Sequence, residues 1–492
     1  LAAADFLHPE PQAGVLRFKH GITRDAVYDS IRLDERTALH QRIAVALHDV
    51  ADLAARDDAL ELKAYHARGA GQWAPAAQLA EQAGDRAMAA FAIDRARAHY
   101  LVAMDAVERL SERGPAEAAR WCLLTNKLGM ACIFDLLAMP DALPIFERAL
   151  LRSREAADDG VTARAHYWLG YMCFGHGRLR RAAEHCRQAL RIASAVADRR
   201  LVAQVEATLG QVLGATSQYD EALGLMDRAL TAKQGHVRSG SSVAVGSAFT
   251  LASRGGALGD RGEFPAAYAA FDEARVLIGA SHHPVANSLL NWMLMVLLWQ
   301  GRWHEAAETA QRSAQLAENT RALLPLALAR VAGGQARWMG EGAVEGFDQM
   351  VEAVRWLEQR QVQFFTSIYY GWLVEACVEL GHLAQARRYA ARLFSRAREG
   401  EIVGRAAGCR GLALAMSRAG DVARARRYLK RAEACAAQRG SRRDQALNLL
   451  CQAQILACQG DIAASAAVAA QARTQLQALG MDWHAQRATL LG

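Results

Sequence analysis

Apolar and polar positions follow two rhythms along most of this chain. Locally, apolar residues recur with the 3.6-residue period of amphipathic helices. Over a longer distance, a turn signal returns about every forty residues: glycine or serine, then any residue, then an aromatic or aliphatic one, usually with alanine three positions later. The signal begins at Gly177, Ser217, Gly262, Gly301, Gly381, Gly420 and Gly460.

This long period predicts stacked helical hairpins that form a solenoid, in which each unit buries its apolar face only against its neighbours. Glycine permits the positive φ that ends a helix, and alanine lets two helices approach closely. The steps between turn signals vary around 40 residues, and the longest, 45 residues from Ser217 to Gly262, contains a Gly- and Ser-rich stretch, Gly235 to Ser247, that we expect to be a loop or a frayed helix end. With only nine prolines and few alternating runs, the chain is predicted to be all-α.

The first fifty residues do not follow the forty-residue rhythm. A strand-like run, Val15 to Phe18, precedes two amphipathic segments that predict helices from Ile22 to Ile31 and from Glu35 to Val50. We therefore divide the chain into a separate segment, residues 1–55, and a helical array, residues 56–492, with ten or eleven hairpins. Because Leu1 is not a methionine and the first residues resemble the middle of a domain, we expect a fragment of a longer protein.

Charge is unevenly distributed. The chain has 58 Lys and Arg against 51 Asp and Glu, a net charge of +7, and residues 385–445 alone carry sixteen basic against five acidic residues. Such a stretch can attract nucleic acid, an acidic protein face or anionic lipid. It is also what the solvated side of amphipathic helices looks like, and this interpretation is favoured, so no nucleic-acid partner is predicted.

The cysteine spacing and the hydropathy indicate the cellular compartment in which the protein is expected. None of the nine cysteines stands in a C-x-x-C pair, which favours small buried hydrophobes in a reducing environment over disulfides. The longest apolar stretch, Ser288 to Trp299, is too short to span a bilayer. We expect a cytoplasmic protein without a membrane partner.

No catalytic motif is found. The phosphate-binding pattern G-x-x-x-x-G-K-[ST] is missing from the sequence. The run Gly255 to Gly262 imitates a glycine-rich nucleotide loop, but no strand precedes it and Gly262 holds a repeat turn. Because no nucleophile stands in a recognisable context either, the chain is predicted not to be an enzyme and to carry no cofactor or catalytic residue of its own.

Two clusters were weighed as binding sites. Soft metal ligands crowd into twenty-one residues, at His166, Cys173, His176, His185 and Cys186, but three of them fall on core positions of the repeat, so no metal site is predicted. His282 and His283 are expected in a loop. Tryptophans concentrate in the middle of the array, where they either line a groove for a peptide or partner helix or form hairpin core: Trp292, Trp299, Trp303, Trp338, Trp356 and Trp372.

Two hairpins carry a more specific pattern. The first has Leu169-Gly170, Gly177, Ala182 and Ala189, and the second repeats it with Leu209-Gly210, Ser217, Ala222 and Ala229. In this pattern the chain resembles a tetratricopeptide array. The period departs from the 34 residues of that family, which implies longer helices or loops.

The opening residues resemble a second family. The phrases Phe18-Lys19-His20, Asp25-Ala26-Val27-Tyr28 and Arg36 with Leu39-His40 are similar to the end of the winged-helix segment that closes the ATPase module of bacterial signal-transduction ATPases. The resemblance implies an upstream module that binds ATP and Mg²⁺, with His20 and Arg24 on the nucleotide side. The alternative is that His20 simply ends a strand and is satisfied by the backbone.

Other phrases are similar to one group of these proteins, in which a class III adenylate or guanylate cyclase is joined to an ATPase and a repeat array. They are Leu128 to Asp135, Tyr167 to Tyr171, Leu298 to Trp303, Tyr370 to Leu373 and Gly480 to His484. This resemblance implies a non-catalytic sensor array whose partners are the ATPase and output domains of the same polypeptide, with a protein or small-molecule signal in the groove. The alternative is the repeat array of an ATP-binding transcriptional regulator.

Overall fold

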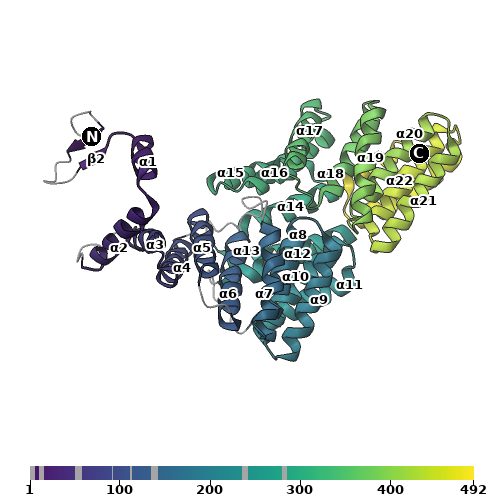
Figure 1. The fold of residues 1–492 in the computed structure, drawn as a ribbon. Coiled ribbons are helices and arrows are strands. Elements are labelled where there is room, and N and C mark those ends of the chain that lie inside the picture. The colour runs from purple at the N-terminus through teal and green to yellow at the C-terminus, as the bar shows by residue number, and fades with distance from the viewer. Residues whose placement is uncertain are drawn as a thin grey trace. The chain divides into compact units, whose positions relative to one another are not determined.

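The computed structural model describes residues 6–9, 16–49, 58–90, 92–110, 114–133, 142–234, 242–279 and 285–491. These residues form a two-stranded sheet and a series of helices (Figure 1). The first elements are β1 (Leu7–Pro9), β2 (Leu16–Phe18), α1 (Gly21–Ser30), α2 (Leu33–Asp49), α3 (Ala59–Gly69), α4 (Trp73–Ala89), α5 (Ile93–Glu108), α6 (Pro115–Cys132) and α7 (Ala142–Glu155).

The remaining helices make up a regular array. They are α8 (Asp159–Gly175), α9 (Leu179–Ala195), α10 (Arg199–Ala215), α11 (Tyr219–Lys233), α12 (Ser242–Arg261), α13 (Phe264–Ile278), α14 (Val285–Gln300), α15 (Trp303–Asn319), α16 (Leu323–Glu341), α17 (Val344–Gln359), α18 (Thr366–Glu379), α19 (Leu383–Arg398), α20 (Arg405–Arg418), α21 (Val422–Arg439), α22 (Arg442–Cys458), α23 (Ile462–Ala478) and α24 (Asp482–Thr489). The chain is an all-α helical-hairpin solenoid, as the long period predicted.

The chain packs as two compact units. The first, unit 1, contains the described residues up to Ala131 together with Arg152–Ala157, and the second, unit 2, contains Cys132–Leu151 and the residues from Asp158 onward. In unit 2 consecutive helices pair as hairpins, from α8 with α9 to α22 with α23. The boundary predicted at residue 55 falls among residues 50–57, outside the described residues, and stays a prediction.

Each predicted turn residue has a left-handed backbone. The φ angles are 67° at Gly177, 63° at Ser217, 87° at Gly262, 85° at Gly301, 75° at Gly381, 78° at Gly420 and 79° at Gly460. The chain therefore ends one helix and starts the next within a few residues. A further turn residue, Gly342 (φ 68°), was not predicted; it precedes α17 in the same way and stands 41 residues after Gly301 and 39 before Gly381.

Aspartate and serine side chains cap the N-termini of several of these helices. Asp158, Asp198, Asp421 and Asp461 each accept a hydrogen bond from the backbone N–H three residues ahead, at 2.9 to 3.1 Å. Ser441 does the same for α22 at 3.3 Å. These caps satisfy N–H groups that the first turn of a helix leaves without partners.

The expectation that repeats contact only their neighbours is wrong for unit 2. Segments about 180 residues apart lie against each other: Gln300 Nε2 donates to the carbonyl oxygen of Gly480 at 3.2 Å, and the rings of Trp303 and Trp483 meet edge to face at 5.1 Å. Earlier in the array, Arg396 donates to the carbonyl oxygen of Gly177 at 2.8 Å. The array thus coils tightly enough for successive superhelical turns to touch.

A buried group of charges joins two of these turns. We call it the Asp260 clasp: Asp260 at the end of α12 with Arg439, Arg443 and Asp444. Arg439 Nη2 lies 2.9 Å from Asp260 Oδ1 and 2.6 Å from Asp444 Oδ2, and Arg443 Nη2 lies 2.6 Å from Asp260 Oδ1. All four side chains are nearly inaccessible, so each charge depends on the others for compensation.

The first residues of unit 1 form a small separate motif. β1 and β2 pair in antiparallel fashion, with Leu7 opposite Phe18, and the two helices predicted after the strand are present as α1 and α2. The motif connects to the first repeat helix, α3, through a chain of ring contacts. Tyr28 Oη lies 2.8 Å from His40 Nε2, and His40 Nδ1 lies 3.0 Å from His66 Nδ1.

Candidate functional site

The helices of unit 2 line a partly open cavity of about 160 Å³, which we call the inner cavity. It is lined by alternate helices of the array, α8, α10, α12, α14, α16 and α18, by two residues of α11, and by the connectors after α6, before α18 and before α20. The lining residues are Ile133, Tyr171, Phe174, Gln211, Gly214, Ala215, Tyr219, Met226, Phe249, Ser253, Gly256, Ala257, Ser288, Asn291, Trp292, Leu294, Met295, Trp299, Leu324, Pro325, Leu328, Ala332, Phe364, Phe365, Ile368, Tyr369 and Val403. None of them has a carboxylate, amine, guanidinium or imidazole side chain.

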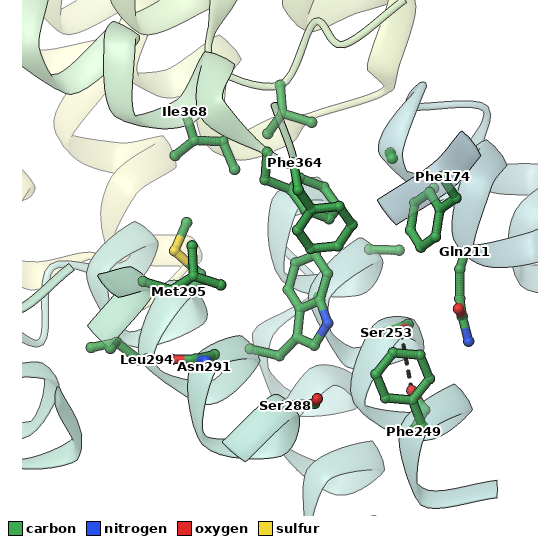
Figure 2. A pocket seen from close by; sticks show the side chains of 18 of the residues that line it. Phe174, Gln211, Phe249, Ser253, Ser288, Asn291, Leu294, Met295, Phe364 and Ile368 are labelled. Atoms are coloured by element: carbon green, nitrogen blue, oxygen red, sulfur yellow. Dashed lines mark hydrogen bonds between the residues drawn. The ribbon is translucent and has the colours of Figure 1, made fainter. Parts of the chain in front are cut away.

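A few polar groups stand among the apolar ones, as Figure 2 shows for Gln211, Ser253, Ser288 and Asn291. Ser253 donates to the carbonyl oxygen of Phe249 within its own helix, at 3.0 Å, and Asn291 Oδ1 accepts from Ser313 at 3.1 Å. Gln211 is 6% exposed, and its Oε1 has no hydrogen-bond partner among the described residues. Gln211 Oε1 is therefore a buried acceptor beside the cavity whose hydrogen-bonding capacity is unused.

The tyrosines in the lining stay neutral. Burial raises the pKa of Tyr171 and of Tyr369 far above 10. For Tyr219, burial and the nearby Asp260 carboxylate both raise the pKa. Since the lining carries no charge at physiological pH, the cavity favours a neutral ligand over an ion, whose desolvation would be uncompensated.

An aromatic row crosses the inner cavity. The ring of Phe174 on α8 meets Phe364 edge to face at 5.1 Å, Phe364 meets Phe365 at 4.5 Å, and Phe365 meets Trp292 on α14 at 5.0 Å. Figure 2 shows Phe364 near the centre of the cavity, with Phe174 to one side and Met295 to the other. The row joins helices that are far apart in the sequence.

A second cavity, of about 150 Å³, continues along the same helices. On α16 the lining passes from Ala332 in the inner cavity to Gln335 in the second, and on α18 from Tyr369 to Trp372. Each step is three residues, less than one helical turn. Unlike the inner cavity, this one carries charged side chains, among them Arg410 and Arg418, and the lining thus changes from neutral to charged along these helices.

The basic stretch 385–445 divides into two kinds of residue. Most of its arginines are exposed on α19 and α21, which agrees with a solvated helix face. Arg396, Arg410, Arg439 and Arg443 are instead buried and paired with carboxylates. Part of the charge excess therefore lies inside unit 2 and is unavailable to a partner.

The two residues predicted on the nucleotide side lie in unit 1, at the start of α1. His20 is exposed and precedes the helix, and its side chain makes no capping bond. Arg24 pairs with the adjacent Asp25 at 2.7 Å on an exposed surface. Nothing in the described residues tests their role toward a nucleotide, and it stays a prediction.

The histidines and cysteines between residues 166 and 186 form a contact pair and buried core positions rather than a metal site. His166 and His185 lie 3.1 Å apart through their Nδ1 atoms, while Cys173 and Cys186 are buried in the hairpin core. Burial raises the pKa of Cys173 to about 11 and that of Cys186 to about 12, so both are thiols rather than thiolates. Among the described residues, no three ligating side chains gather in an arrangement suited to a metal ion. His282 and His283 lie outside the described residues.

The glycine run near residue 255 is helical. Gly255, Gly256 and Gly259 lie within α12, where a Cβ atom would come 2.2 to 2.4 Å from Phe271, Trp292 and Val296 respectively. These glycines allow neighbouring side chains to pack directly onto the helix backbone.

The tryptophans divide between cavity lining and packing contacts, and a role in binding a peptide or partner helix stays a prediction. Trp292 and Trp299 line the inner cavity, and Trp338 and Trp372 line the second one. Trp303 packs against Trp483 between superhelical turns, and Trp356 lies beneath the guanidinium of Arg360, 4.0 Å from its ring centre.

The cysteines follow the buried pattern that was expected, with one difference. None of the nine forms a disulfide bond, and eight are buried: Cys122, Cys132, Cys173, Cys186, Cys377, Cys409, Cys435 and Cys451. Cys458, at the end of α22, is exposed. In the part of the chain that the structure describes, no helix combines the length and apolarity that crossing a membrane requires.

Comparison with known proteins supports the repeat assignment. The tetratricopeptide repeat family profile matches residues 161–235, which cover α8 to α11, the two hairpins that carried the pattern in the sequence. No curated protein matches the chain.

Among solved structures, the chain is similar to a Rap protein complexed with the competence and sporulation factor, with 14% identity and a TM-score of 0.51 over 78% of this chain and 97% of that one. Weaker similarity is found to the apo quorum sensor NprR from B. thuringiensis (14% identity, TM-score 0.45, 65% and 87% covered). It is also found to the APC/C hetero-tetramer Cut9-Hcn1 (15% identity, TM-score 0.45, 96% of both chains). The profile match and the first of these similarities place the array in the tetratricopeptide-like class of α solenoids.

Proposed function

We propose that this chain is a non-catalytic sensor module, which binds a peptide or a protein segment on the concave face of unit 2. The observation that carries the proposal is the inner cavity, built from alternate helices and lined by apolar and amide side chains. Concave solenoid surfaces of this kind suit an extended chain, because many repeats contribute to one continuous groove. The structure of a Rap protein complexed with a signalling factor is consistent with such a role for this fold.

We further propose that the signal passes to an ATPase module and a nucleotidyl cyclase in the same polypeptide, with ATP and Mg²⁺ bound in that module. The support is the resemblance of residues 18–40 to the segment that closes such ATPases. A ligand that prefers one of two arrangements of the whole protein shifts the equilibrium between them by its difference in affinity, so no catalytic residue is needed in the array.

The ring contacts within unit 1 support a mechanical connection at the start of the array. His40 is 4% exposed and lies between Tyr28 and His66, and burial lowers the pKa of both histidines. These neutral, packed rings tie α1 and α2 to α3. We infer that a rearrangement of the first repeats moves the preceding segment with them.

The test uses the intact natural polypeptide. Rates of ATP hydrolysis and cyclic-nucleotide formation are measured for the wild type, for a variant that lacks residues 158–491, and for Ser288→Glu, which places a charge in the neutral cavity. We expect both changes to alter the output. Val276→Glu is the matched control, because Val276 is 76% exposed on α13 and the added carboxylate stays in water.

Thermal unfolding of Ser288→Glu is measured first, and its activity is compared with that of the wild type only if the fold is retained. If deletion of the array leaves both rates unchanged, the regulatory role is wrong. The present chain alone is expected to turn over neither ATP nor GTP, and measurable turnover would contradict its non-catalytic assignment.

A further inference from the structure

We propose that the inner cavity recognises a neutral peptide segment with two adjacent aromatic side chains. In the absence of that segment, the rings of Phe364 and Phe365 make the contacts that its aromatic side chains would make. The inference rests on the proposed function, because it names the ligand class and the regulation of the same site. It follows from how one connector of unit 2 is seated in the cavity.

The connector runs between α17, which ends at Gln359, and α18, which begins at Thr366. Its last two residues place their rings in the cavity, between Phe174 on one wall and Trp292 on another. The two rings thus form part of the cavity wall, and they show that the neighbouring walls accept consecutive aromatic rings in edge-to-face contact.

The backbone of the connector indicates that the ring contacts hold it. Phe365 has a φ of 53°, in the left-handed region that residues with side chains rarely adopt, and it stands directly before a helix rather than at the end of one. A conformation of this kind persists only where the surroundings impose it. A ligand that took over the contacts of the two rings would let Phe365 return to an ordinary backbone conformation.

The connector is anchored on both sides of Phe364 and Phe365, whose side chains are half-buried. Gln363 accepts a hydrogen bond from Arg396 at 2.8 Å, and its carbonyl oxygen accepts one from Thr366 at 3.3 Å. Arg396 is itself held by Glu401 and by the carbonyl oxygen of Gly177. Displacement of the two rings therefore has to be accommodated between Gln363 and the start of α18, where the Ile368 N–H donates to the carbonyl oxygen of Phe365 at 3.2 Å.

The lining determines the chemistry of the incoming segment. Since none of the described lining residues is charged, a lysine or glutamate side chain would lose its hydration without gaining a partner among them. The amide of Gln211 and that of Asn291 can bond to a peptide backbone, whose N–H and C=O groups need partners when they are buried. A neutral aromatic pair with flanking backbone fits both requirements.

The probe is the hexapeptide Gly-Ser-Phe-Phe-Ser-Gly, acetylated and amidated so that it carries no charge, and its affinity for the full chain is measured by titration calorimetry. The comparison peptide has Glu-Lys in place of Phe-Phe. In the double variant Phe364→Ala/Phe365→Ala the competing rings are gone, so we expect the aromatic peptide to bind about tenfold more tightly than to the wild type. The comparison peptide should bind neither protein.

Two further variants keep the test decisive. Phe364→Leu/Phe365→Leu retains apolar volume and should fold even if the alanine variant does not, and it should also bind the aromatic peptide more tightly than the wild type. Ser288→Glu should weaken binding. Equal affinity in wild type and both ring variants would overturn the competition, and no preference for the aromatic over the charged peptide would overturn the ligand class.

Failure here and failure of the proposed function are distinguishable. The proposed function is judged by the output of the intact polypeptide when the array is deleted. If deletion changes that output while the aromatic peptide does not bind, the sensor role stands and this ligand assignment is wrong.

Discussion

At the scale of single residues, the array is built on small side chains where helices cross. A Cβ atom added to Gly170 would come 2.7 Å from Cys186 Sγ, and one added to Gly210 would come 2.8 Å from Met226. These were two of the positions that carried the repeat pattern in the sequence. They could be predicted because close helix approach demands the smallest residue at a fixed place in each hairpin.

The space around each glycine predicts opposite effects for two glycine-to-alanine changes. Gly170→Ala should destabilise unit 2 by about 1–3 kcal/mol, because the new methyl group overpacks against Cys186. Gly224→Ala, on α11, should be neutral or stabilise by up to about 1 kcal/mol, because its nearest neighbour would be Arg228 at 3.8 Å and alanine favours the helix. Urea unfolding of the two variants gives the comparison.

A buried histidine predicts a pH effect. Burial lowers the pKa of His484 to about 3, well below the 6.5 of an unfolded chain. Between pH 6.5 and pH 3 the His484 imidazole is protonated in the unfolded state but not in the folded state. The free energy of unfolding is therefore unaffected by this histidine above pH 6.5 and decreases as the pH falls toward 3.

We therefore expect His484→Gln to flatten the loss of stability between pH 7 and pH 4.5. The difference in unfolding free energy between wild type and variant should shift by about 2 kcal/mol over that range. Groups common to both proteins cancel in this difference. A difference that stays constant with pH would show that His484 is protonated in the folded protein.

At the scale of helices and connectors, the periodic turn signal predicted the hairpins. At each predicted turn the helix ends at a residue with a left-handed backbone, and that local conformation favours glycine, which is visible in the sequence. The aromatic connector was not predicted. Phe364 and Phe365 fall between two hairpins, where the repeat imposes no residue type, and only their meeting with Phe174 and Trp292 gives them a role. That meeting depends on tertiary structure.

Two turn glycines with the same local conformation predict different costs. Gly381→Ala should destabilise by about 1–2 kcal/mol, the backbone term alone, because nothing lies within 4 Å of the added Cβ. Gly177→Ala should cost about 1–3 kcal/mol more, because its Cβ would come 2.8 Å from the carbonyl oxygen of Gln363. Similar midpoints of chemical unfolding for the two variants would show that this neighbour yields readily.

At the scale of the whole molecule, the contacts between successive superhelical turns of unit 2 escaped prediction. They depend on the small rotation between repeats, which accumulates over four or five hairpins and leaves no periodic mark in the sequence. The arginine-rich stretch illustrates the limit. Composition showed an excess of charge, but only the coiled array brings Arg439 and Arg443 to Asp260, which precedes them by about 180 residues.

The Asp260 clasp predicts cooperative unfolding of unit 2. Asp260→Asn removes a carboxylate that faces two buried arginines, and it should destabilise the protein by about 3–5 kcal/mol and separate one unfolding transition into two. Asp272→Asn is the control: its ion pair with Arg275 is exposed on both sides, so its effect should stay within about 1 kcal/mol. Differential scanning calorimetry distinguishes one transition from two, and a single transition in Asp260→Asn would contradict the role of the clasp.

The distribution of thiols has a practical consequence. With eight cysteines buried and Cys458 exposed, a maleimide fluorophore should attach to the natural chain at one position, near the end of the array. Energy transfer from a second dye on a bound peptide would then report the distance between the inner cavity and α22. Such a signal would follow the coiling and uncoiling of the array in real time, without any change to its sequence.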